Sequence, residues 1–155
     1  MDDLKYKLLE AIRAELRARL ERLNRAANEA HAAATDPGSK AESKYDTRNL
    51  EASYLAVGQA KQAAEIVESV RVFDHLTLPN FARGSAVDAG ALVETEMRGQ
   101  KAFFLLVPSC GGMEVAADGV MATLLTPESV LYRSLLEQHV GDFIPGPDLK
   151  ISSVC

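Results

Sequence analysis

Three carboxylates, Asp36, Glu42 and Asp46, gather in a short polar stretch between two apolar-striped segments of the chain. The flanking segments, Asp3 to Thr35 and Thr47 to Val72, have the spacing of long helices, so residues 36–46 are predicted to be the exposed turn of a helical hairpin. A pair of long antiparallel helices has little interior in which to enclose a substrate. We therefore expect any chemistry of these carboxylates to take place inside a partner protein that receives the hairpin tip, residues 36–46.

Apolar residues recur at spacings of three and four in both flanking segments, which predicts two amphipathic helices. Two steps of four in the first segment favour a fairly straight pair over a tight left-handed supercoil. Pro37 and Gly38 break the pattern, and a short connection favours antiparallel pairing. The stripes are Leu9, Ile12, Leu16, Leu20, Leu23, Ala27, Ala30 and Ala34, then Leu50, Tyr54, Val57, Ala60, Ala64, Val67 and Val70.

Alanines are concentrated in the two predicted helices on the side of the tip. Small side chains allow two helix backbones to approach closely, so we expect a slim hairpin that is thicker at its leucine-rich base, near Leu9, Ile12 and Val67. The alanines concerned are Ala26, Ala27, Ala30, Ala33 and Ala34 in one segment and Ala52, Ala56, Ala60, Ala63 and Ala64 in the other.

The helical pattern stops near Pro79, and the composition then shifts toward Val, Phe, Leu and Gly. We expect a boundary there, with an antiparallel coiled-coil hairpin at 1–76 and a small α+β domain at 77–155. Strands are predicted at 91–97, 101–107, 119–125 and 149–154, and a short helix at 129–139 with Leu131, Leu135 and Leu136 directed inward. A domain of about 75 residues has a thin core, so its stability should also depend on docking of the hairpin base.

The charge balance argues against direct binding of nucleic acid. The chain has a net charge of −5, made up of −1 over residues 1–80 and −4 over residues 81–155. Proteins that grip phosphates need clustered Lys and Arg, which this balance does not provide.

The remaining composition predicts a protein that stays in the cytoplasm. No apolar run reaches membrane-spanning length, and the first residues lack the basic end and apolar block of a secretory signal. Cys110 and Cys155 lie far apart without a CxxC spacing, and His31, His75 and His139 are scattered, so no disulfide framework and no metal site within the monomer is predicted.

The residues from Thr126 to Asp142, together with the order and lengths of the two parts, resemble the bacterial Gre-type transcription factors. Ser129, Leu131, Leu135, Leu136, Gly141 and Asp142 fall in register with that family's Ser-Pro-Leu-Gly, Leu-Leu-Gly and Gly-Asp signature, whereas Val130, Tyr132 and Glu137 replace its usual Pro, Gly and Gly. The resemblance implies an N-terminal coiled-coil hairpin joined to a C-terminal domain of FKBP-like fold.

The resemblance also implies a partner and a mechanism. In that family the hairpin enters the secondary channel of RNA polymerase, and tip carboxylates help to hold a Mg²⁺ that drives cleavage of a backtracked transcript. Carboxylate oxygens suit Mg²⁺, and a second metal can generate hydroxide for an in-line displacement. Here the candidate carboxylates are Asp36, Glu42 and Asp46, with Lys44 and Arg48 as candidate contacts to the polymerase or transcript.

The tip differs from the family's pattern, in which an Asp and a Glu stand three residues apart, so two modes of action remain open. The protein either stimulates cleavage, with catalysis belonging to the polymerase, or occupies the channel without cleavage. Asp46 can equally cap the second helix, Asp36 before Pro37 can end the first, and exposed Lys44 and Arg48 need no partner.

Two further classes of function compete with a polymerase-binding factor. An FKBP-like fold allows a peptidyl-prolyl isomerase, which would need an aromatic-lined pocket built from Phe81, Phe103, Phe104, Tyr132 and Phe143. Alternatively, the hairpin base dimerises and the protein is a scaffold. Cys110 has no acid and base partners that can be placed beside it, which favours a strand-connecting turn over a nucleophile.

Overall fold

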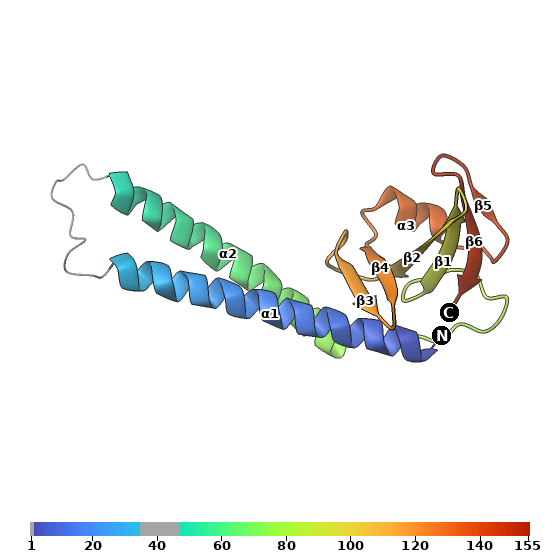
Figure 1. Cartoon of the computed structure of the whole chain (residues 1–155), viewed down its shortest axis with the longest axis horizontal. Coiled ribbons are helices and arrows are strands. Elements are labelled where there is room, and N and C mark those ends of the chain that lie inside the picture. Colours follow the sequence, from blue (N-terminus) through green and yellow to red (C-terminus); the bar gives the residue numbers. More distant parts are fainter. Residues whose placement is uncertain (1, 35–46) are drawn as a thin grey trace. The chain divides into compact units, whose positions relative to one another are not determined.

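The computed structural model describes residues 2–34 and 47–155, and the side chains of 3–33 and 55–155. Two long helices, α1 (Asp2–Ala34) and α2 (Thr47–His75), precede a mixed sheet of six strands that packs with one short helix, α3 (Val130–Leu135) (Figure 1). The strands are β1 (Leu92–Met97), β2 (Gln100–Leu106), β3 (Glu114–Ala117), β4 (Val120–Leu125), β5 (Phe143–Ile144) and β6 (Leu149–Val154). The predicted class, a helical hairpin followed by a small α+β domain, is confirmed.

Contacts divide the chain into two compact units. The C-terminal unit joins residues 1–13 to residues 72–155, and the hairpin unit contains residues 14–71. The first 13 residues, which include the base of α1, therefore belong to the same unit as the sheet. No single boundary along the chain separates the two units. None of the described helices is both long and apolar enough to cross a membrane.

Both long helices have local interactions typical of stable helices. In α1, Lys7 pairs with Asp3 and Arg19 pairs with Glu15, each four residues apart, with N···O distances of 2.7 and 2.8 Å. Such pairs lie on one helix face and each add a few tenths of a kcal/mol. The 33 residues of α1 span about 50 Å at 1.5 Å per residue.

The two helices run antiparallel. In the hairpin unit Arg19, Arg22 and Leu23 of α1 line a shallow cavity of about 280 Å³ together with Ile66 of α2. Nearer the start of α1, Arg13 hydrogen-bonds to Phe73 near the end of α2. Residue numbers thus rise along one helix as they fall along its neighbour, as predicted.

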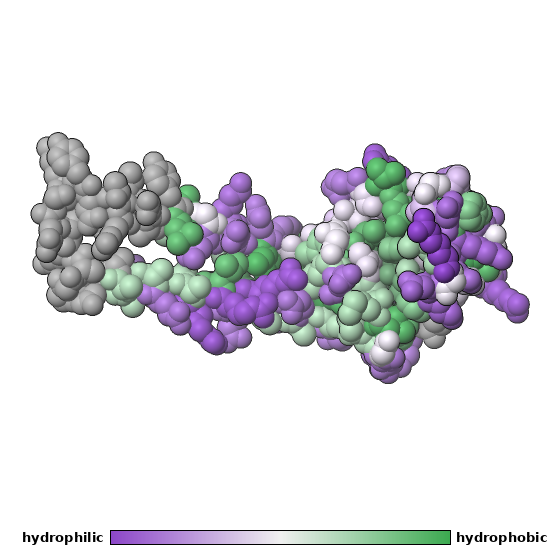
Figure 2. Space-filling view, turned by 45° about the horizontal axis from the view of Figure 1, so that its top comes forward, coloured by the Kyte–Doolittle hydropathy of each residue, from purple (hydrophilic) through white to green (hydrophobic). Residues whose placement is uncertain are grey.

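The prediction of close alanine packing is wrong for the described residues. Ala26, Ala30, Ala33, Ala56, Ala60 and Ala64 are exposed, and only Ala27 and Ala63 are half-buried. Larger apolar side chains of α2 are exposed as well, with Leu55 at 60% and Val57 at 70%. Figure 2 shows hydrophobic patches interspersed with hydrophilic surface along these helices. Methyl groups bury too little area to hold two helices in tight contact without larger neighbours.

The sheet has the strand order β3-β4-β2-β1-β6-β5, in which β2 and β4 are parallel and all other neighbours are antiparallel. Two of its hairpins are closed by two-residue turns with positive φ at both positions, Arg98-Gly99 (52° and 78°) and Asp118-Gly119 (51° and 77°). This geometry matches the right-handed twist of the flanking strands and favours glycine at the second position.

Four predicted strands are confirmed, whereas β3 and β5 were not predicted from the sequence. The Asp118-Gly119 turn is the signal that could have revealed β3, because Asp-Gly between apolar residues is a strong hairpin pattern. The two residues of β5 are too short for any periodicity. Helix α3 is also shorter than expected and ends at Leu135. Glu137, two residues later, has a positive φ, which is incompatible with a continuing helix.

One face of the sheet packs with α3 in the main core of the C-terminal unit (Figure 1). Tyr132 and Leu135 of α3 are buried there, and Leu131 and Leu136 pack partly against the same cluster. The sheet residues of this core are Val93, Leu106, Leu125, Leu149 and Ile151.

The opposite face of the sheet carries a second set of buried residues. Leu92, Leu105 and Leu124 lie in register across β1, β2 and β4, and all three are fully buried. Lys7 of α1 pairs with Asp118 in the β3–β4 turn at 2.8 Å. Since the α1 residues Leu8, Leu9 and Ile12 belong to the same compact unit and are buried, we infer that they supply this cover.

Candidate functional site

The hairpin tip lies outside the described residues. Helix α1 ends at Ala34 and α2 begins at Thr47, so Asp36, Glu42, Lys44 and Asp46 belong to the segment between them, for which no placement is described. Arg48 lies in the first turn of α2, and its side chain is also outside the description. The predicted roles of all five residues stay predictions.

The helices that lead to the tip have a mixed charge rather than a single-sign surface. Glu15 lies 2.8 Å from Arg19 and 3.2 Å from Arg22, and Glu68 lies 2.7 Å from Arg71. The hydrogen bond from Arg19 is the main cause that lowers the pKa of Glu15, and the one from Arg71 lowers that of Glu68. Arginines so paired are poorly suited to gripping a polyanion, because their charge is already compensated.

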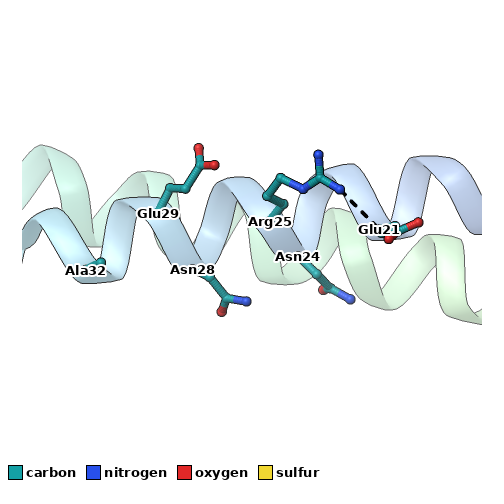
Figure 3. A pocket seen from close by; sticks show the side chains of 6 residues that line it. All are labelled: Glu21, Asn24, Arg25, Asn28, Glu29 and Ala32. Carbon is teal, nitrogen blue, oxygen red and sulfur yellow. Dashed lines mark ion pairs between the residues drawn. The ribbon is translucent and has the colours of Figure 1, made fainter.

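A shallow hollow of about 460 Å³ follows α1 toward the tip and shows the same mixture of charges. Figure 3 shows Glu21 and Arg25 joined by an ion pair, with Asn24 and Asn28 pointing to one side of the helix and Glu29 to the other. The nitrogen and oxygen of the Glu21–Arg25 pair are 3.9 Å apart, and both side chains are exposed. This face is a solvated helix surface with adaptable polar groups, and it has no cluster suited to a metal or a nucleophile.

The base of the hairpin is fixed by Arg13. Its guanidinium donates from Nε and Nη2 to the carbonyl oxygen of Phe73, at 3.0 and 2.8 Å, while Nη1 pairs with Glu10 at 2.6 Å. A cation at the end of α2 satisfies a terminal carbonyl and complements the helix dipole.

A second basic residue of α1, Lys5, is buried with only 2% of its surface exposed. Its Nζ donates to the carbonyl oxygen of Pro79 at 2.5 Å and lies 4.9 Å from the centre of the Phe81 ring. Sequence reasoning assigned no role to Lys5 or Arg13. The signal for Lys5 was its position three and four residues before Leu8 and Leu9, on the apolar stripe of α1.

The Gre-like residues of the C-terminal unit have clear structural roles. The Ser129 side chain accepts a hydrogen bond from the backbone N–H of Tyr132 and caps α3, and Leu135 is fully buried. Gly141 has a φ of 97°, and Asp142 Oδ2 accepts from the N–H of His139 at 2.7 Å. These positions therefore build the segment around α3, and Tyr132 is buried in the core.

In the described part of the chain, no group of three or more His, Cys, Asp or Glu side chains is placed so that it could hold a metal ion. Cys110 lies in the turn between β2 and β3, half-buried, with its Sγ 3.7 Å from Ser109 Oγ. The thiol of Cys155 is buried and donates to the carbonyl oxygen of Leu92.

Of the aromatic residues considered for an isomerase pocket, three pack in or against the main core of the C-terminal unit, namely Phe81, Phe104 and Tyr132. Phe81 lines a cavity of about 560 Å³, with no other aromatic residue among those that line it. Phe103 is half-buried on β2, and Phe143 is 57% exposed. Among the described residues they do not converge on this cavity.

Comparisons with known proteins give only remote structural likenesses. No family model and no curated protein matches the sequence. Among solved structures, GreA factor homolog 1 (Gfh1) of Thermus thermophilus is 17% identical with a TM-score of 0.37, covering 92% of this chain and 94% of its own. Gfh1 of Thermus aquaticus is 17% identical with a TM-score of 0.37, covering 91% and 92%, and a further structure of the transcription factor Gfh1 is 20% identical with a TM-score of 0.35, covering 93% of each chain.

Proposed function

We propose that the protein is a Gre-like regulator that binds RNA polymerase and places its hairpin tip in the secondary channel. The observation that carries the proposal is the pair of antiparallel helices, 33 and 29 residues long, joined by a segment that contains Asp36, Glu42 and Asp46. A long hairpin with carboxylates at its connection suits delivery of oxygen ligands into a cavity of another protein.

The C-terminal unit supports the same proposal through its sequence. Six positions around α3 match the Gre-type signature, and the structure gives Ser129, Leu135, Gly141 and Asp142 defined roles in forming this segment. The chain itself has no catalytic role, and the polymerase supplies the chemistry.

The metal that the tip carboxylates would help to bind is a Mg²⁺ ion shared with the polymerase. Asp36, Glu42 and Asp46 supply hard anionic oxygen ligands, which fit Mg²⁺ better than a softer metal. Within the polymerase, such ligands would help to retain a second ion that activates water and stabilises the leaving oxygen.

The departure of the tip from the Gre pattern supports a second mode of the same function, in which the factor occupies the channel and does not stimulate cleavage. One experiment separates the two modes. Purified protein is added to bacterial elongation complexes stalled in a backtracked state, and shortened transcripts and nucleotide addition are measured together. Cleavage products support the first mode, and slowed nucleotide addition without cleavage supports the second.

A lack of both effects, combined with a lack of binding to the polymerase, would overturn the proposal. The scaffold alternative predicts instead a stable dimer that is indifferent to polymerase, which light scattering would detect. The isomerase alternative predicts turnover of a proline peptide by the full chain.

A further inference from the structure

A cavity of about 560 Å³ opens beside β6 in the C-terminal unit and has no part in the proposed function of the tip. One wall is formed by Ser152, Ser153, Val154 and Cys155 at the end of β6. The lining is completed by Phe81, Arg83, Gly84 and Val140. All of these residues belong to one compact unit.

The strand β6 is open along this cavity because β5 is short. β5 pairs with β6 only through Phe143 with Lys150 and Ile144 with Leu149. Two more hydrogen bonds extend the ladder to Ile151, from Gly141 N–H to Ile151 O at 2.8 Å and from Ile151 N–H to Asp142 O at 3.0 Å. Beyond Ile151, no described strand pairs with that side of β6.

The backbone of Val154 is directed toward the open side. Cys155 exchanges both of its backbone hydrogen bonds with Leu92 of β1, at 2.8 and 3.0 Å. Neighbouring residues of an antiparallel strand direct their N–H and C=O groups to opposite sides, so those of Val154 point away from β1. An extended chain in the cavity could pair with them as an added strand.

The side chains of the cavity favour an acidic occupant with an apolar neighbour. Arg83 is the only charged side chain of the lining, in a chain whose net charge is −5. Among the described residues Arg83 has no ion-pair partner, so its charge is available to a ligand. Phe81, Val140 and Val154 supply an apolar surface next to it.

The wall that carries Phe81 is held in place by α1. The Lys5 ammonium lies 4.9 Å from the ring centre and donates to the carbonyl oxygen of Pro79, two residues earlier. A cavity wall fixed before binding reduces the ordering cost of an added peptide.

We propose that the cavity binds an extended peptide segment of a partner protein by strand addition to β6, with an acidic side chain of the peptide at Arg83. Hydrogen bonds to the backbone of Val154 align the peptide along β6. The apolar surface of the cavity contacts a neighbouring side chain of the peptide, and Arg83 favours an acidic side chain over a basic one. The proposal is independent of polymerase binding by the tip.

The test uses the full chain and a panel of labelled five-residue peptides with Thr at both ends, Val at positions 2 and 4, and each residue type in turn at position 3. Fluorescence anisotropy measures binding. We expect the Asp and Glu members to bind at least tenfold more tightly than the Lys member. Arg83→Glu should remove this preference, whereas Arg98→Glu, which changes an exposed arginine in the β1–β2 turn, should keep it.

A second measurement separates strand addition from simple charge attraction. The best peptide is remade with N-methyl groups on alternate backbone nitrogens, in both registers, which removes its donors without changing its charge. We expect one register to lose at least tenfold in affinity, and the amide of Val154 to exchange its hydrogen more slowly when the unmodified peptide is bound. Absence of binding by every panel member, equal binding of Asp and Lys members, or equal binding of both methylated forms and the parent would each overturn the proposal.

Discussion

The Arg13 guanidinium donates two hydrogen bonds to the carbonyl oxygen of Phe73, 60 residues away in the sequence. This contact ties the start of one long helix to the end of the other. Only 20% of the Arg13 side chain is exposed, so the charge is partly withdrawn from water where it meets the carbonyl. The contact lies within the C-terminal unit, which contains the first residues of α1 and the last residues of α2.

Replacing Arg13 by Met should destabilise the protein by about 2 kcal/mol, because a hydrogen bond to a charged donor contributes about 1.5–3 kcal/mol and the carbonyl is left without this partner. Arg13→Lys keeps the charge but not the planar fork and should lose about half as much. Urea unfolding followed by circular dichroism measures both. The matched control is Arg19→Met, whose exposed pair with Glu15 should contribute under about 1 kcal/mol. Equal losses for Arg13→Met and the control would contradict the assigned role.

A fragment of residues 77–155 should fail to fold cooperatively, because it lacks Leu8, Leu9, Ile12 and Phe73. These side chains are at most 3% exposed in the full chain. Each buried side chain of this size contributes about 1.5–3 kcal/mol, and together they approach the whole stability of a typical domain, about 5–15 kcal/mol. The control joins residues 1–13 to residues 72–155 through a short Gly-Ser linker and should unfold cooperatively. A fragment 77–155 as stable as this control would show that the α1 base is dispensable.

Shortening Ile12 to Ala should cost about 2–5 kcal/mol, since the side chain is fully buried and a cavity would replace it. Leu55→Ala removes a similar side chain that is 60% exposed, and should change stability by less than about 0.5 kcal/mol. Thermal unfolding of the two variants tests the difference. Similar melting temperatures would mean that α1 does not cover the sheet as inferred.

Replacing both Glu42 and Asp46 by Ala should abolish the effect on stalled elongation complexes while leaving the helical circular dichroism nearly unchanged. Loss of a helix cap at Asp46 would cost only about 1 kcal/mol. The control is Glu29→Ala with Glu65→Ala, which removes two exposed carboxylates from the described helices. A double tip variant that retains full activity would exclude these two carboxylates from the mechanism.

The pair of Glu15 with Arg19 predicts a small dependence of stability on pH. Hydrogen bonding by Arg19 holds the folded-state pKa of Glu15 below the ordinary value of 4.5. A group with a depressed folded pKa stabilises the protein above its unfolded pKa, and this contribution disappears as the pH falls through the folded value. Glu15→Gln should therefore cost about 0.5 kcal/mol at pH 7, because the pair is partly exposed. The difference between the two proteins in urea unfolding should shrink below pH 4.5 and vanish at lower pH; a difference that persists unchanged in acid would contradict the assignment.

Local patterns in the sequence determined the elements of this protein. The apolar spacing of three and four gave both long helices, because a helix that buries one face must repeat with its own turn. Short runs rich in apolar and β-branched residues predicted β1, β2, β4 and β6. The residues around α3 carried the resemblance to Gre-type factors. The position of Asp36, Glu42 and Asp46 between the helices also follows from the sequence alone.

Only the tertiary structure decided which distant residues share an environment. It brought Arg13 to Phe73, Lys5 to Pro79 and Phe81, and Lys7 to Asp118. It also placed β4 parallel to β2 and left β6 open beyond Ile151. Periodicity reports which face of an element is buried, but not what buries it. That choice depends on the packing of the whole unit, which is why the base of α1 belongs with the sheet and most of the described alanines of the hairpin are exposed.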